Sequence, residues 1–418
     1  MKLRRFISMM LIVTMLTVFA GCGDKDERTQ AARSLNLDGP ITINIWYNDS
    51  SYESYLEFVA KQFKQANELV TIQLRYIEEE SYVNYVYDES VRNDNACDIY
   101  FLTSEEIEKA YLCGLMSEND LYPDIYNEDV YGKAAINACS YKGKLYGYPV
   151  SFNASFLLYN MKYAQPVSNI NEIQEISDNY QITDENQDVT MVFTWNPDSM
   201  FINYAAVGAY MNVGGENSED SSSVSMDEDN IKKMLTKYSQ LKSAFNIERG
   251  EVSVDDCVER FTSGGLLYTV IDADNIAKVD ASDVNFGVCP YPAMGDDLES
   301  RTLSVTTMAV VNPYTKHVDA SKAVARAISY DYADYLEGTA GKSCARGDIK
   351  VKKNSESYNK IHQIYSDSVV KAKYIGVGEV YMRYEIMLHQ VYDGTSVDSA
   401  YSTFATTIDK VQNATTQQ

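Results

Sequence analysis

The sequence predicts an α/β fold in which a mixed sheet is covered by helices, and the first segments of the chain support this. Residues 41–46 alternate and are rich in β-branched side chains, as is typical of a strand, and residues 70–76 predict a second strand. Between them, residues 55–66 carry large apolar side chains at helical spacing. Residues 98–102 are short and apolar, like a buried parallel strand. Strands that alternate with helices favour a parallel or mixed sheet.

The later segments continue the alternation. We expect, in order, a hairpin-like unit over 141–150, a strand over 156–159, a polar loop over 166–188, an apolar helical stretch from Asp198 through Tyr210, an exposed acidic loop over 214–229, a helix over 231–245 and a strand over 266–271. A strand over 303–311, a helix over 320–329 and a mostly helical tail over 355–410 follow. In the tail, Tyr381 and Tyr384 are spaced so that both lie on one helix face.

The N-terminus predicts export and a lipid anchor. Residues 1–21 have a basic head and an uncharged apolar run that is too short to span a bilayer, as in a signal peptide. The end of this run resembles a bacterial lipobox at Cys22, with Phe19 where Leu is usual. The alternative is a simple secretory leader followed by a buried or paired cysteine. Residues 22–40 are polar and aperiodic, which indicates a flexible tether after the lipidated cysteine.

Charge and length limit the possible functions. Removing the signal peptide, with its three basic residues, would lower the formal net charge from −24 to −27. Such an acidic protein repels phosphate backbones, so we expect no nucleic-acid partner. The length favours two domains or lobes, each with its own core.

Catalytic and metal-binding motifs are missing from the sequence. The six cysteines after Cys22 show no zinc-type spacing, so we expect no metal and no cofactor, and isolated buried thiols are slightly favoured over disulfides. They are Cys97, Cys113, Cys139, Cys257, Cys289 and Cys344. None of the three histidines has a recognisable catalytic setting. We therefore expect a protein that is not an enzyme, although a secreted carbohydrate-active enzyme remains an alternative.

Residues 141–149 read Tyr-Lys-Gly-Lys-Leu-Tyr-Gly-Tyr-Pro. This is the most telling of several segments that, taken in order, resemble the extracellular solute-binding proteins of ABC importers, in the sugar-binding branch that includes maltose-binding protein. Residues 96–101 with 111–116 resemble the family's strand and the Gly-Leu motif after it. Residues 158–160 and 286–292 resemble its later motifs. The resemblance covers nearly all of the chain from residue 41 onward.

This resemblance implies a two-lobed periplasmic-binding-protein-like fold of type II, in which each lobe is a mixed sheet flanked by helices. The implied lobes are 41–150 plus 293–340, and 151–292 plus 341–418, with hinges near Pro149, Tyr291 and Gly341. The implied protein is a monomer that is anchored to the outer face of the bacterial cell membrane and captures a sugar for ABC permease subunits. A ligand-sensing lipoprotein that reports to a membrane receptor is an alternative with the same fold.

Candidate ligand-binding residues follow the predicted strands. A sugar site needs flat aromatic rings beside carboxylates or amides. Trp46 and Trp195, the only two tryptophans, each precede a polar cluster, although each is as readily a core residue. Asp49 and Ser51 follow the first tryptophan, and Asp198 follows the second.

The other candidates rest on position. Asp272 and Asp274 follow a strand where the family usually has an aromatic turn, and an EF-hand loop is rejected there because no oxygen ligand and glycine follow. Four residues match ligand-facing regions of the family by position alone, namely Glu105, Asn153, Arg346 and Tyr381. A cap, hinge hydrogen bond, ion pair or core ring is the alternative for each, and for Arg346 that alternative is pairing with Asp348.

Overall fold

The structure of the chain is a computed structural model. It describes residues 35, 37–92, 96–349 and 354–415. The predicted signal peptide, Cys22 and most of the predicted tether lie outside the described residues.

The chain opens with a parallel βαβ unit, as predicted. Strand β1 (Ile41–Tyr47) pairs in parallel with β2 (Val70–Tyr76) on one side and β3 (Ile99–Thr103) on the other. Helix α3 (Glu53–Ala66) connects β1 to β2 and buries Tyr55, Leu56, Val59 and Phe63. Because both faces of the sheet are covered, four of the five residues of β3 are fully buried.

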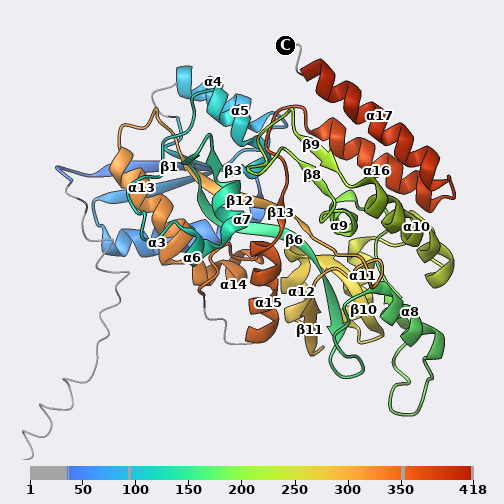
Figure 1. The fold of residues 1–418 in the computed structure, drawn as a ribbon. Coiled ribbons are helices and arrows are strands. Elements are labelled where there is room, and N and C mark those ends of the chain that lie inside the picture. The colour runs from blue at the N-terminus through green and yellow to red at the C-terminus, as the bar shows by residue number, and fades with distance from the viewer. Residues whose placement is uncertain (1–34, 36, 93–95, 350–353, 416–418) are drawn as a thin grey trace, which may run out of the picture.

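A single long strand connects two halves of the molecule. Strand β6 (Tyr148–Asn160) pairs along its first part with β12 (Leu303–Val311) and along its second part with β10 (Leu266–Asp272) and β11 (Phe286–Cys289). The resulting nine-stranded curled sheet has the order β2-β1-β3-β12-β6-β10-β7, where β7 is Met191–Thr194. Figure 1 shows β6 running between the two halves, which we call the β1 half and the β10 half.

Helices cover both faces of the sheet in the β1 half. The residues of α4 (Tyr82–Arg92) and α5 (Ile107–Leu112) join a core cluster on one face, and those of α3, α7 (Lys133–Ala138), α13 (Val318–Arg326) and α14 (Leu336–Ala340) join a second cluster on the other. The short helix α6 (Glu128–Tyr131) completes this part, and helix α15 (Ser355–Ser366) packs against both halves, on α7 and on β11.

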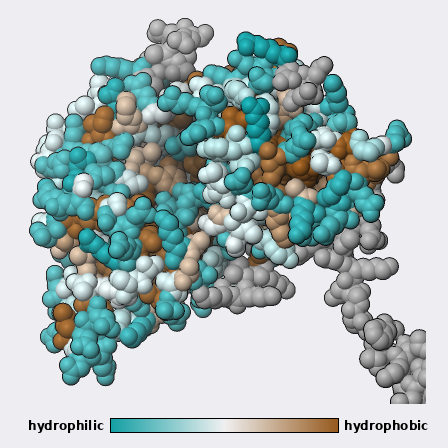
Figure 2. Space-filling model, turned by 180° about the vertical axis from the view of Figure 1, so that it is seen from behind, coloured by the Kyte–Doolittle hydropathy of each residue, from teal (hydrophilic) through white to brown (hydrophobic). Residues whose placement is uncertain are grey.

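The β10 half contains α8 (Ile170–Asn179), α9 (Met200–Asn203), α10 (Glu228–Phe245), α11 (Val254–Thr262), α12 (Ile276–Asp280), α16 (Gly378–Tyr392) and α17 (Val397–Thr415). It also carries the hairpin of β8 (Met211–Val213) and β9 (Val224–Met226). Figure 2 shows the rear surface as mostly hydrophilic, with hydrophobic residues in scattered recesses.

Three sequence-based expectations were wrong in detail. The expected loop 166–188 contains α8, because Ile170 and Ile173 are buried and Asn169 caps the helix. The expected helical stretch ending at Tyr210 is only α9 and a 3₁₀ turn, and the expected acidic loop contains β9. The expected strand 156–159 is confirmed as the second part of β6. The tail is mostly helical, as expected, and also contains the short strand β13 (Val369–Val370), which pairs with β12.

The thiols and the last helices agree with the sequence. All six described cysteines are free, and all are buried except Cys113, which is partly exposed. Tyr381 and Tyr384 are both buried on α16, as their spacing predicts. Within the described residues, no helix combines the length and hydrophobicity needed to cross a bilayer.

Candidate ligand-binding site at the junction of the two halves

Lys342 forms an ionic bridge between the two halves. Its Nζ lies 3.1 Å from Asp49 Oδ2 and 3.1 Å from Asp274 Oδ1. Asp49 directly follows the β1 strand region, and Asp274 follows β10, so one carboxylate comes from each half. Lys342 itself comes directly after Gly341, whose φ of 65° ends α14 in the left-handed conformation that glycine tolerates.

Three more candidate residues lie in contact with this bridge. Ser51 donates its backbone N–H to Asp49 Oδ1 over 2.9 Å. Asn153, on β6, accepts a hydrogen bond of 3.3 Å from the backbone N–H of Asp274, and its side chain also hydrogen-bonds to Asp272. We call Asp49, Ser51, Asn153, Asp272, Asp274 and Lys342 the junction cluster.

The charges of the junction cluster compensate one another unevenly. Burial lowers the pKa of Lys342. The interactions of its ammonium group with Asp274, Tyr52 and Asp49 raise this pKa by more, so the pKa of Lys342 lies above its usual value. Burial works against ionisation of Asp49 too, yet the Ser51 hydrogen bonds and Lys342 bring its pKa below the usual value. Buried charges need such partners because desolvation is costly.

Asp272 is the less well compensated carboxyl of the junction cluster. Burial raises its pKa, and Asp274 adds to this, while hydrogen bonds from Asn275 and Asn153 oppose it. Asn275 Nδ2 donates to Asp272 Oδ1 over 2.8 Å. Asp272 therefore depends on Asn275 and Asn153 to favour its ionised form.

A second ion pair lies at the same end of the sheet. Glu105 follows β3 and pairs with Lys371, which follows β13. The Lys371 ammonium also lies 5.3 Å from the centre of the Tyr381 ring. Tyr381 is only 2% exposed, and its hydroxyl accepts a hydrogen bond from the backbone N–H of Ala372, so the structure places this ring in the core beside the pair.

Both tryptophans lie in core positions. Trp46 is 3% exposed and packs against Tyr85, with the Arg75 guanidinium over its ring. Trp195 is 1% exposed, stacks on Phe193 and donates its indole N–H to Asn203. The structure therefore assigns both rings to packing, and neither contacts the junction cluster in this conformation.

Two further candidates lie away from the junction cluster. Asp198 accepts a hydrogen bond of 2.9 Å from Arg249, within the β10 half. Arg346 forms a bidentate pair with Asp348 and stacks at 3.9 Å over the Tyr330 ring. Arg346 therefore pairs with Asp348, which was the alternative to ligand binding given for it from the sequence.

Lys342 and Lys371 were missed by the sequence analysis. Each is a single lysine without a motif, and Lys342 is 68 positions from Asp274 while Lys371 is 266 positions from Glu105. The available signal for Lys342 was its place directly after the predicted hinge at Gly341, whereas Lys371 adjoins no predicted crossing. The described residues contain no group of three or more His, Cys, Asp or Glu that could hold a metal.

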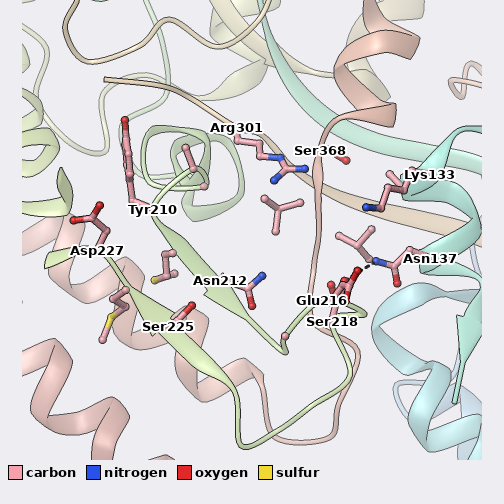
Figure 3. Close-up of a pocket in the computed structure, with 18 of the residues that line it drawn as sticks. Lys133, Asn137, Tyr210, Asn212, Glu216, Ser218, Ser225, Asp227, Arg301 and Ser368 are labelled. Carbon is pink, nitrogen blue, oxygen red and sulfur yellow. Dashed lines mark hydrogen bonds between the residues drawn. The ribbon is translucent and has the colours of Figure 1, made fainter. Parts of the chain in front are cut away.

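A groove of about 550 Å³ lies between α7 of the β1 half and the β8–β9 hairpin of the β10 half. We call it the hairpin groove, and Figure 3 shows Lys133 and Asn137 on one side with Tyr210 and Asn212 on the other. Ser366 and Ser368, at the end of α15, also line it.

The hairpin groove and the junction cluster lie on opposite faces of β6. Asn153 contacts Asp274, whereas the preceding Phe152 stacks at 3.8 Å on Tyr365 of α15, the helix that ends at the groove. Successive side chains of a strand point to opposite faces. The groove is therefore a separate feature.

A bacterial extracellular solute-binding protein family model matches residues 59–329 of the chain. The chain belongs to this family. The family is extracellular by description, which places this solute-binding protein outside the cytoplasm. A comparison with curated protein sequences finds no match.

Solved structures with the same fold cover almost all of this solute-binding protein. A cyclo/maltodextrin-binding protein complexed with maltotetraose has a TM-score of 0.71 at 14% identity and covers 92% of this chain and 99% of its own. A Staphylococcus aureus solute-binding protein in complex with maltose has a TM-score of 0.71 at 14% identity, covering 90% and 98%. The Alicyclobacillus acidocaldarius maltose-maltodextrin binding protein has a TM-score of 0.68 at 16% identity, covering 88% and 100%. These matches confirm the periplasmic-binding-protein-like fold.

Proposed function

We propose that this solute-binding protein is anchored to the membrane through lipidated Cys22, captures an extracellular sugar or oligosaccharide between its halves and delivers it to an ABC permease. The observation that carries the proposal is the Lys342 bridge, because it brings polar groups from both halves into one place. A solute that contacts both Asp49 and Asp274 favours the state in which the halves are together.

The chemistry of the junction cluster suits a polyhydroxylated ligand. Carboxylates accept hydrogen bonds from sugar hydroxyls, and an ammonium or amide donates to them. Asp49, Asp274 and Lys342 supply these groups within 3.1 Å contacts that a hydroxyl could join or replace. Solved structures with the same fold include a cyclo/maltodextrin-binding protein complexed with maltotetraose and a Staphylococcus aureus solute-binding protein in complex with maltose, which supports a sugar as the ligand class.

Movement between lobes is the proposed mechanism of capture. The proposed lobes are residues 41–150 with 293–340, and residues 151–292 with 341–418. Closure is productive only if the ligand contacts both lobes, because a ligand shifts a conformational equilibrium by its difference in affinity for the two states. A permease that recognises the closed lobes would then receive only loaded protein.

A thermal-shift series tests this function. Maltose, maltotetraose and other neutral oligosaccharides are added to the soluble chain from residue 23 onward, and a ligand that binds the folded state should raise its melting temperature. Lys342→Met should weaken the affinity at least tenfold, about 1.4 kcal/mol, because it removes the cation shared by the halves. Lys237→Met, at an exposed lysine on α10, is the matched control and should bind as the wild type does. Stabilisation by no oligosaccharide, or equal affinity in Lys342→Met and wild type, would contradict the proposal.

A further inference from the structure

Two cations from different parts of the fold enter the hairpin groove. Lys133 lies at the start of α7, and Arg301 lies just before β12. Figure 3 shows the two side chains extending into the groove from opposite sides, with their nitrogens directed toward each other. Like charges repel, so such an arrangement is favourable only when an anion or solvent lies between them.

Neither cation is neutralised by the protein. Lys133 makes no hydrogen bond or ion pair with any described residue, and Arg301 uses only its Nε, which donates to the backbone oxygen of Asp367 over 2.6 Å. The terminal nitrogens of the Arg301 guanidinium thus stay available to an oxyanion. By contrast, Lys232 on the nearby surface pairs with two carboxylates, at 2.9 and 2.8 Å.

Tight packing fixes the backbone at the start of α7, directly before Lys133. The preceding Gly132 lies against Ser366, so that a Cβ at residue 132 would come within 2.8 Å of Ser366 Oγ, and its φ is 82°. Two acidic residues also line the groove. The Asp227 carboxylate is bound to Asn230 as the cap of α10. The backbone oxygen of Glu216 accepts a hydrogen bond of 3.5 Å from Asn137, one turn after Lys133 on α7, and no ion pair joins the Glu216 carboxylate to Lys133 among the described residues.

We propose that the hairpin groove is a second ligand site, which binds a small oxyanion, a carboxylate or a phosphate, through Arg301 and Lys133. Lys133 belongs to the β1 half, and the backbone N–H of Arg301 donates to Ala205 in the β10 half over 2.8 Å. A bound oxyanion therefore links the two halves on the face of β6 opposite the junction cluster. The site goes beyond the proposed sugar-binding function and does not depend on it.

The expected binding is weak and sensitive to salt. Both cations are exposed, and salt screens interactions between exposed charges over about 8 Å at physiological ionic strength. Two contacts between exposed charges fit a dissociation constant of about 1 mM. Raising the ionic strength tenfold should weaken the binding several-fold.

Calorimetric titration of the sugar-free protein tests the site. Inorganic phosphate and citrate are used separately at constant ionic strength, so that the two arms distinguish phosphate from carboxylate as the preferred group. Lys133→Met and Arg301→Met should each weaken binding at least tenfold, while Lys237→Met should leave it unchanged. Absence of heat for both anions at about 10 mM, or wild-type binding in both variants, would overturn the proposal.

Two controls keep the result independent of folding and of the proposed function. Lys133→Met changes an exposed side chain and should keep the wild-type circular dichroism and melting temperature. The same variant should keep the sugar-induced rise in melting temperature. If the wild type binds anions but no sugar raises its melting temperature, only the sugar proposal is contradicted. If sugars raise its melting temperature but the wild type binds neither anion, only the anion site is contradicted.

Discussion

At the scale of single residues, Glu337 is a carboxyl whose charge changes close to neutral pH. Burial raises the pKa of Glu337 to about 7. The charge of Asp280 also raises this pKa, whereas a hydrogen bond from the Cys344 backbone lowers it. The folded protein therefore binds this proton more tightly than the unfolded chain does. The stabilisation that the bound proton gives the folded protein is fully present below the ordinary glutamate pKa of 4.5, and it is lost as the pH rises from 4.5 to about 7.

Glu337→Gln should remove this pH dependence. The free energy of unfolding in urea, measured at pH 5 and pH 7.5, should fall with pH by up to about 3 kcal/mol more in the wild type than in the variant. Glu259→Gln, at an exposed position of α11, should keep the wild-type dependence. If the free energy of unfolding depends on pH in the same way in the wild type and in Glu337→Gln, burial does not shift the pKa of Glu337.

Some candidate residues could be located from sequence because polar residues follow buried strands. Asp49 and Asp274 meet at Lys342 for this reason, since strand ends from both halves point to one junction. The tryptophans could not be assigned, because both faces of β1 are covered and a side chain at Trp46 is buried whichever way it points. Lys342 required the three-dimensional fold, since no local pattern links it to its partners.

At the scale of elements, α8 depends on its first cap. Asn169 Oδ1 accepts the backbone N–H of Glu172 over 3.1 Å, and Asn169 Nδ2 donates to Asp296 over 2.9 Å. Only Ile170 and Ile173 are buried on this ten-residue helix, so the cap contributes a large share of its stability.

Asn169→Ala should lower the free energy of unfolding by about 1 kcal/mol, because it removes the cap and the contact with Asp296. Urea titration followed by circular dichroism measures the change. Asn179→Ala, at the exposed C-terminal end of the same helix, is the matched control and should have a smaller effect. Equal effects of the two substitutions would show that the cap does not stabilise α8.

Elements with strong periodicity could be predicted closely, and weak ones could not. The expected strand 303–311 coincides with β12, and the expected helix 231–245 lies within α10, because each has many buried apolar residues. Helix α8 was missed because its sequence is dominated by Glu, Asp and Asn, with two buried residues. The strand predicted over 156–159 is part of the longer β6, which includes Pro149 near its start, where proline is tolerated.

At the scale of the whole molecule, one core spans both halves. The same cluster of buried residues includes Tyr55 of α3 and Tyr238 of α10, and β6 supplies ladder partners to strands of both halves. Loss of either half therefore exposes apolar surface and unpaired backbone of the other. The α/β class and the family followed from segment order, whereas the contacts between halves depend on tertiary packing that no segment encodes alone.

The two halves should unfold in one transition. Trp46→Phe leaves a single tryptophan in the β10 half, and Trp195→Phe leaves one in the β1 half. In each variant, the urea midpoint from fluorescence should coincide with the midpoint from far-ultraviolet circular dichroism. Separate midpoints in either variant would show that the halves unfold independently.

The sharing of β6 also fixes the geometry of any opening. Sliding one half past the other would break ladder hydrogen bonds along β6, whereas bending or twisting the ribbon of β6 and β12 keeps them. Rotation about such a ribbon produces displacements that grow in proportion to the distance from it. The strands at the two edges of the sheet, β2 and β7, would thus travel farther than the strands beside β6, and the peptide units beside Ala154 would hardly shift.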